Sequence, residues 1–217
     1  RRQVSLMLQR PHCAVSYTNA LVVSSDDVPL GVFSSQVPDE FSIEFLARRG
    51  NFLHYGSMLY RANLKSVILE LVPPFIDYRM HLALARHGKI GWLKQAGTVY
   101  RAETATSMIR NNRDHVRELG WFALEECVFS SGMSVECKAE AAASFIVPVI
   151  GISIRSSNSA YFLRWMRRSI SWASRDSYIL LLWLKVLTLA ASRLFGAVVR
   201  KTFGRSPGSD VRIFYVR

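Results

Sequence analysis

Short apolar segments alternate with polar turns along the first third of the chain, which is typical of a mixed α/β domain. The segment Cys13–Val23 is rich in β-branched and aromatic residues and stops at the turn-forming residues 24–27, so it predicts a strand. Before Pro11, the segment Arg2–Gln9 carries spaced apolar residues and fits the end of a helix that leads into this strand.

Helical and extended patterns continue through the next hundred residues. A run that begins at Asp39, placed to act as an N-cap, and stops at Gly50 predicts a short helix. Pro73-Pro74 forces an extended break, and Asp77–His87 then has apolar residues at helical spacing. The remaining elements expected are a strand at 52–61, a helix at 63–71 and a helix at 106–129. Two short apolar segments at 89–94 and 98–103 suit either consecutive strands or a strand and a loop.

Composition narrows the class of protein. Half of the 217 residues are apolar and 20% are charged, which is the composition of a chain that forms a core. The three cysteines, Cys13, Cys127 and Cys137, share no metal-ligand spacing and form a poor disulfide framework, so a reducing compartment is expected. The spacing predicts no zinc or iron–sulfur site.

Charge is concentrated at the C-terminal end. The chain has 28 Lys and Arg against 16 Asp and Glu, for a net charge of +12. Twelve of the basic and two of the acidic residues lie in Arg155–Arg217, so this stretch carries +10 and the rest only +2. We therefore expect an α/β domain at 1–150, a Ser-rich linker at 151–160, and a basic, apolar helical tail at 161–217.

Several short motifs follow one another in a suggestive order. Gly50-Asn51-Phe52 is followed by Ser57 and Tyr60-Arg61, then by Asp77–Gly91 (DYRMHLALARHGKIG) and by Val99-Tyr100-Arg101. In order and spacing these motifs resemble the acceptor-side half of family 2 glycosyltransferases, inverting enzymes with the GT-A fold. The resemblance begins near the N-terminus, covers roughly half of the chain, and implies a partial GT-A-like mixed sheet with flanking helices.

The resemblance implies that Asp77 is a catalytic base. An inverting transfer needs a base to take the proton of the acceptor hydroxyl, and a carboxylate is favoured at a helix N-terminus. The alternative is that Asp77 only caps its helix. Asn51, Ser57, His81 and Arg101 are the implied substrate-binding residues. For His81 the alternative is a buried structural histidine, and for Arg101 it is a surface ion pair.

A divalent metal is also implied. Glu103 stands where the family often carries a histidine, and its carboxylate offers an oxygen ligand for Mg²⁺ or Mn²⁺. The family's nucleotide-sugar half, with its acidic metal-binding motif, normally precedes the matched region and supplies most of the metal site. Because the sequence begins with Arg1 rather than Met, we expect the C-terminal part of a longer enzyme, inactive alone.

The tail predicts a basic amphipathic helix between residues 161 and 201. Its basic residues fall within an arc of roughly 100° at helical periodicity, and its remainder is rich in Trp and Leu. These residues are Arg164, Arg167, Arg168, Arg175, Lys185, Arg193 and Arg200. Such a helix suits an anionic headgroup layer. Packing on the globular part is one alternative; spanning the bilayer is another, although each interior basic residue then costs about 2.5–3.5 kcal/mol.

Two functions follow from these patterns. The first is part of a glycosyltransferase that moves a sugar from a nucleotide-sugar donor to a glycan or lipid-linked acceptor, in surface polysaccharide or glycolipid synthesis. It would act in the cytoplasm, peripheral to the inner face of the cell membrane. The second is a noncatalytic module that binds anionic membrane through its basic tail. Nucleic acid is a weaker candidate partner, because the sequence has no recognisable RNA- or DNA-binding motif.

Overall fold

The structure is a computed structural model that describes residues 1–73, 76–102, 112–156, 158–173, 184, 187–188, 191–192 and 212–215. It has two compact units. The first comprises Arg1–Ala123 with Ser209–Arg217, and the second comprises Leu124–Gly208. This division falls inside the segment 1–150 that the sequence analysis treats as one domain.

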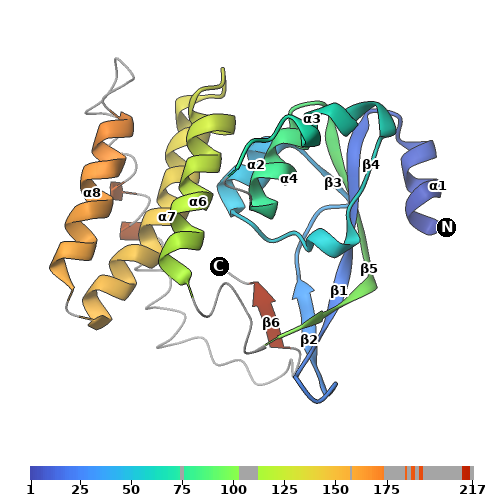
Figure 1. The fold of residues 1–217 in the computed structure, drawn as a ribbon, viewed down its shortest axis with the longest axis horizontal. Helices are drawn as coiled ribbons and strands as arrows, with labels where there is room; N and C mark the ends of the chain where they lie inside the picture. Colours follow the sequence, from blue (N-terminus) through green and yellow to red (C-terminus); the bar gives the residue numbers. More distant parts are fainter. Residues whose placement is uncertain are drawn as a thin grey trace. The chain divides into compact units, whose positions relative to one another are not determined.

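A curled, mixed sheet organises the first unit (Figure 1). Its strands are β1 (Cys13–Val23), β2 (Pro29–Ser34), β3 (Glu40–Phe41), β4 (Leu59–Tyr60), β5 (Lys89–Arg101) and β6 (Arg212–Tyr215). The order is β3-β5-β1-β2-β6, and β4 pairs with the first half of β1. The pairs β1–β5 and β2–β6 are parallel, whereas β1–β2, β1–β4 and β3–β5 are antiparallel. The expected mixed α/β class is therefore confirmed.

Helices cover both faces of this sheet around β1. Helix α1 (Arg2–Gln9) packs through Leu6 and Met7 against Cys13, and α4 (Asp77–Ala85) bonds to Tyr17 through His81. A Cβ on Gly91 would meet Leu6 and Ser16, so Ser16 faces α1 while its neighbour Tyr17 faces α4. Alternation of side chains along a strand therefore places α1 and α4 on opposite faces (Figure 1).

Two helix predictions are confirmed and one start is wrong. Helix α1 and the beginning of α4 agree with the sequence pattern. Helix α2 covers Ile43–Arg49 with Ser42 as N-cap, because the residues just after Asp39 form β3 instead. It ends at Gly50, whose φ of 78° explains the glycine there. The remaining helices of this unit are α3 (Lys65–Leu69) and α6 (Arg113–Leu124).

Two of the strand predictions need correction. Segment 52–61 forms a strand only at β4, preceded by a 3₁₀ turn at Tyr55–Ser57. Conversely, β5 is one continuous strand where two short segments were expected. Its register against β1 shifts between Thr18 and Asn19, so the residues between Leu93 and Ala96 are accommodated as a bulge.

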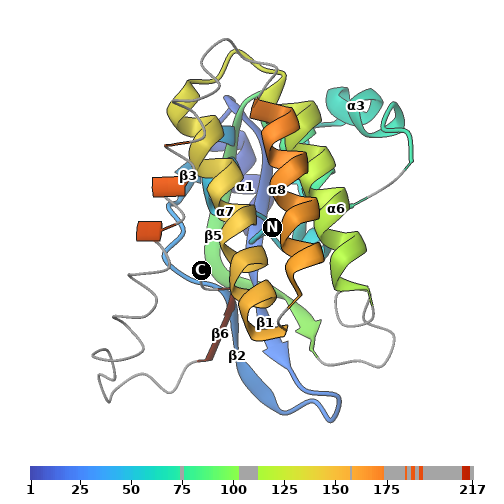
Figure 2. The same cartoon turned by 90° about the vertical axis from the view of Figure 1, so that its left-hand side faces the viewer.

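The second unit is helical within its described residues. A π-helical turn at Glu125–Phe129 precedes α7 (Val135–Ser156) and α8 (Ser159–Ala173), and α7 and α8 lie side by side (Figure 2). Most of the expected linker 151–160 is therefore helix. The serine there does not break α7, because Ser153 Oγ donates to the Val149 carbonyl at 2.9 Å.

The described part of the expected helical tail 161–217 is α8, a few isolated residues and β6, which is a strand paired with β2 rather than helix. No helix among the described residues is long and apolar enough to cross a membrane. Four of the seven basic tail residues, namely Arg175, Lys185, Arg193 and Arg200, lie outside the described residues. The prediction of one continuous basic helix therefore stays a prediction beyond α8.

Candidate functional site

Asp77 is the first residue of α4 and is half-buried. It is not the helix cap, because Ile76 occupies the N-cap position and the helix start has no side-chain cap hydrogen bond. Within the described part of the chain, the Asp77 carboxylate has no hydrogen-bond or salt-bridge partner. The sequence left two roles open for Asp77, catalytic base and helix cap. The structure excludes the helix cap.

Three side chains from different elements lie within electrostatic reach of this carboxylate. Burial, and secondly the Asp77 charge, raise the pKa of Tyr17 in β1 and of Tyr100 in β5. Burial lowers the pKa of His54, while Asp77 acts in the opposite direction. The Asp77 charge therefore acts on ionisable rings from β1, β5 and the loop before β4.

His81 lies one turn beyond Asp77 and is fully buried. Its Nδ1 is 2.7 Å from the Tyr17 hydroxyl, and the two rings meet edge to face with centroids 5.0 Å apart. Burial lowers the pKa of His81 to about 3, so the ring is neutral and Nδ1 shares a hydrogen bond with the Tyr17 hydroxyl. Its Nε2 is buried without a hydrogen-bond partner in the structure. Tyr17 and His81 thus form a buried pair that joins β1 to α4.

His54 and its neighbours form an aromatic wall. The His54 ring lies 5.4 Å from Phe33 and 5.6 Å from Tyr100, centroid to centroid, and its Nδ1 is 3.1 Å from Thr98 Oγ1. Tyr55 is half-exposed, and its ring centroid is 6.5 Å from that of His81. None of Tyr17, His54, Tyr55 and Tyr100 was singled out as a site residue from the sequence. Only their aromatic or imidazole character, spread over 84 positions, could have suggested them.

Ser57 is a structural residue in this arrangement. Its hydroxyl accepts from the Thr18 amide at 3.2 Å and lies 3.0 Å from the Thr18 carbonyl and 2.9 Å from the His54 carbonyl. Gln3 adds a side-chain bond to the Ser57 carbonyl. The serine thereby holds the loop that carries His54 against β1, and its contribution to the site is indirect.

Asn51 and Arg101 have different surroundings. Asn51 follows the end of α2, and its Oδ1 is buried without a hydrogen-bond partner. The Arg101 guanidinium pairs with Asp27 at 2.5 Å and donates to the Ser24 and Ser25 carbonyls in the β1–β2 turn. Arg101 therefore makes the surface ion pair that was its alternative, and its contacts are at the hairpin rather than around Asp77. Glu103, the weak metal candidate, lies outside the described residues.

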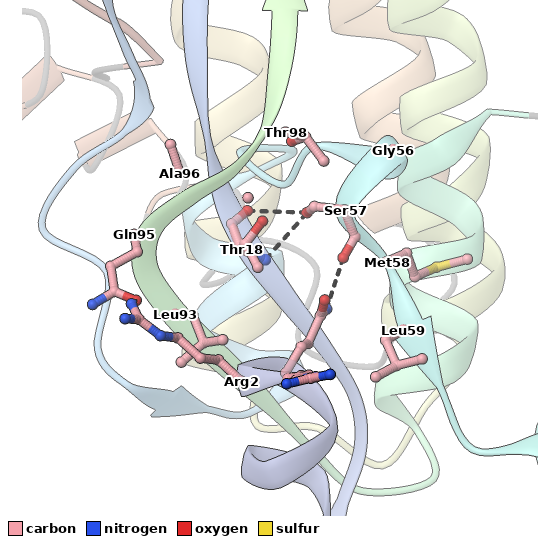
Figure 3. A pocket seen from close by; sticks show the side chains of 13 residues that line it. Arg2, Thr18, Gly56, Ser57, Met58, Leu59, Leu93, Gln95, Ala96 and Thr98 are labelled. Atoms are coloured by element: carbon pink, nitrogen blue, oxygen red, sulfur yellow. Dashed lines mark hydrogen bonds between the residues drawn. The ribbon is translucent and has the colours of Figure 1, made fainter.

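A pocket of about 540 Å³ opens on the face of β1 and β5 toward the start of α1 (Figure 3). Arg2, Gln95, Thr18 and Ser57 line it, and Thr98, the hydrogen-bond partner of His54, stands at its border. Arg2 and Gln95 are hydrogen-bonded to each other across it. Thr98 thus connects the pocket to the aromatic wall near Asp77.

Comparisons with known proteins add no assignment. No protein-family model matches the chain, and neither a curated protein nor a solved structure matches it significantly. Functional inference therefore depends on the residues and their geometry.

Proposed function

We propose that the first unit is the acceptor-side part of an inverting glycosyltransferase in which Asp77 is the general base. The observation that carries this proposal is the environment of Asp77: a half-buried carboxylate at a helix N-terminus, neither capping the helix nor paired with any described side chain. The order of motifs from Gly50 to Glu103, which resembles family 2 glycosyltransferases, gives the same assignment.

The chemistry asked of Asp77 is the removal of one proton. As the acceptor hydroxyl attacks the sugar carbon, opposite the departing diphosphate, its proton passes to the Asp77 carboxylate. The amino end of α4 favours the anionic form of the base before the reaction. Tyr55 and Tyr100 offer ring faces and hydroxyls of the kind that suit the apolar faces and hydroxyl groups of a sugar acceptor. The neutral Tyr17–His81 pair does not compete for the acceptor's proton.

The donor belongs to the other half of such an enzyme. On this proposal a nucleotide sugar and Mg²⁺ or Mn²⁺ are bound mainly by an acidic motif outside this chain, and the acceptor is a glycan or a lipid-linked glycan. We place the complete enzyme in the cytoplasm, peripheral to the inner face of the cell membrane. The chain alone is then expected to show no Mn²⁺-dependent binding of nucleotide sugars in calorimetric titration.

The direct test is Asp77→Asn in the complete protein. The amide cannot accept the acceptor's proton, so sugar transfer should fall by about 10²- to 10⁴-fold while donor binding and thermal unfolding stay near wild type. Asp39→Asn is the matched control, because Asp39 is an exposed carboxylate that pairs only with Lys94 at 3.3 Å among the described side chains. Near-wild-type turnover in the Asp77 variant would remove the base assignment.

Membrane binding without catalysis is the second candidate function, and α8 favours it. Leu163 and Ile170 are each about half exposed on this helix, and Arg164 and Arg167 are exposed beside them. Apolar and basic side chains on one exposed surface suit an anionic headgroup layer, where each basic residue contributes about 1 kcal/mol.

Sedimentation of the full chain with vesicles tests this second function. Phosphatidylserine-containing vesicles should retain the wild-type chain better than neutral vesicles, and Arg164→Gln with Arg167→Gln should remove most of that difference. Arg2→Gln with Arg86→Gln is the control with the same change in net charge, made in the first unit. Equal retention of both double variants would contradict a specific role for α8.

A further inference from the structure

A second cluster of reactive side chains lies at the other end of β1. His12 is in the turn before β1, Cys13 is the first residue of β1, and Glu40 is the first residue of β3. Strand β5 brings them together, since β1 pairs with it on one side and β3 on the other. The register places Glu40 opposite Gly91 and Cys13 opposite Lys89.

The three side chains converge on one point. His12 Nε2 is 2.7 Å and Cys13 Sγ is 3.8 Å from the same oxygen, Glu40 Oε2. All three ligand atoms lie within 4.8 Å of one another. Gly91 lies beside the cluster, since a Cβ there would be in van der Waals contact with Cys13 Sγ at 3.7 Å, while its tight contact, at 2.5 Å, would be with Leu6 Cδ2 of α1.

The three side chains of the cluster differ in their exposure to solvent. Cys13 is completely buried, whereas the side chains of Glu40 and His12 are 32% and 55% exposed. An ion can therefore arrive from solvent at the imidazole and the carboxylate, with the sulfur beneath them. The outer side stays open to water.

We propose that His12, Cys13 and Glu40 form a binding site for Zn²⁺ or a similar borderline-soft divalent cation, with solvent at the fourth position. The ligand set of imidazole, thiolate and carboxylate is one that Zn²⁺ accepts, while the sulfur makes the site unsuited to Mg²⁺ or Mn²⁺. The site is therefore distinct from the metal expected of a nucleotide-sugar enzyme, and it does not depend on the proposed catalytic function.

Only small movements separate the present geometry from coordination. Tetrahedral Zn²⁺ with usual bond lengths puts sulfur and oxygen ligands about 3.5 Å apart, and nitrogen and oxygen ligands about 3.3 Å apart. The Cys13–Glu40 separation of 3.8 Å is already close to this value. The His12–Glu40 hydrogen bond would open by about 0.6 Å. On binding, the thiol proton is released to solvent.

Neighbouring cations oppose the ion: Lys89 acts on Glu40, Arg61 acts on Cys13, and Arg10 acts on both. An Arg10 guanidinium nitrogen lies 3.9 Å from Glu40 Oε2, and the same nitrogen donates to the Asp39 carbonyl at 2.7 Å. This cation competes with the metal for the carboxylate. Removing this competing charge should help an ion that binds at Glu40. We therefore expect Arg10→Gln to strengthen metal binding by several-fold.

Cobalt titration of the full chain tests the site, because Co²⁺ adopts zinc sites and gives a thiolate-to-metal charge-transfer absorption. One equivalent of Co²⁺ should produce this absorption, and Zn²⁺ should abolish it. Cys13→Ala should remove the absorption, and the matched variant Cys127→Ala should retain it, since Cys127 is also a buried cysteine but lies in the other unit. Absence of the absorption in the wild type, or its persistence without Cys13, overturns the proposal.

An exposed ligand provides a readout that does not depend on the buried sulfur. His12→Gln should fold like the wild type and bind Co²⁺ at least about tenfold more weakly, since even second-sphere changes cost about 10- to 100-fold in affinity. Zinc should raise the unfolding temperature of the wild type more than that of this variant. An equal shift in both proteins overturns the assignment of His12 as a ligand.

Discussion

The first unit holds two carboxylates near the two ends of its central strand, and their surroundings are opposite. Glu40 is partly exposed and tied to His12 at 2.7 Å and to Arg10 at 3.9 Å. The hydrogen bond from His12 is the main reason that the pKa of Glu40 is lowered. Asp77 is half-buried and has no such partner among the described side chains.

Imidazoles account for much of this difference. An imidazole approaches each carboxylate, but burial lowers the pKa of both His54 and His81, so the rings near Asp77 are neutral. His12 is exposed and bonds directly to Glu40. A carboxylate accepts a proton more readily when the side chains beside it are neutral than when they are cations. The same residue types therefore surround a carboxylate without a described pairing partner in one region and a hydrogen-bonded carboxylate in the other.

Acid sensitivity should separate the two regions most strongly. The pKa of His81 is about 3 in the folded protein and near 6.5 when unfolded, so below pH 6.5 the unfolded chain binds the extra proton. The free energy of unfolding should then fall with decreasing pH toward pH 3, with a slope approaching about 1.4 kcal/mol per pH unit from this residue. Above pH 6.5 the residue contributes no slope.

His81→Asn should flatten that slope while keeping an acceptor for the Tyr17 hydroxyl. Urea unfolding at several pH values between 4 and 7 measures the difference. Glu40→Gln is the comparison from the other region, and it should change the slope much less because its side chain is 32% exposed. An unchanged slope in the His81 variant would mean that the histidine is not held neutral in the folded state.

Gly88 should prove critical because it connects the regions, between the end of α4 and the start of β5. A Cβ at this position would lie 2.5 Å from the His12 carbonyl oxygen and 3.1 Å from the Ala14 amide nitrogen, and both are backbone atoms. Gly88→Ala should therefore cost roughly 1–3 kcal/mol of stability in denaturant unfolding. Gly132→Ala, with nothing within 4 Å of its Cβ, should cost nothing measurable. Equal effects of the two substitutions would refute the steric argument.

Arg101→Gln should have the smallest effect. Its ion pair with Asp27 is at the surface, so its loss should cost about 0–1 kcal/mol in thermal or urea unfolding. In the complete protein the variant should leave KM and kcat for sugar transfer unchanged, since its contacts are with the hairpin turn. A large loss of donor affinity would instead restore Arg101 as a ligand of the diphosphate.

Local patterns predicted the elements that local forces determine. The bounds of β1 and α1 match the sequence pattern, and α4 starts at Asp77 as expected. These segments have clear apolar periodicity and are bounded by turn residues or proline. The same patterns identified Asp77 and His81, because motif order and helical spacing are visible along the chain.

Other features depend on partners distant in sequence. Gly97 reads as part of a break between two strands, but it lies within β5, which passes so close to β1 there that a Cβ would be 2.5 Å from Thr18 Oγ1. Segment 52–61 reads as a strand, but Ser57 bonds to the Thr18 backbone and ties most of it down as a turn and loop. In both places a contact with β1, invisible in the local pattern, decides the conformation.

The sequence by itself therefore determined the α/β class, the central strand and the helix that begins with Asp77, because periodicity and turn chemistry act over neighbouring residues. Only the tertiary structure decided that Tyr17, His54 and Tyr100 gather around that carboxylate, and that Arg101 does not. It also decided that Cys13 and Glu40 meet across β5. Strand order and register bring distant residues together, and neither is encoded in the spacing of residues along one segment.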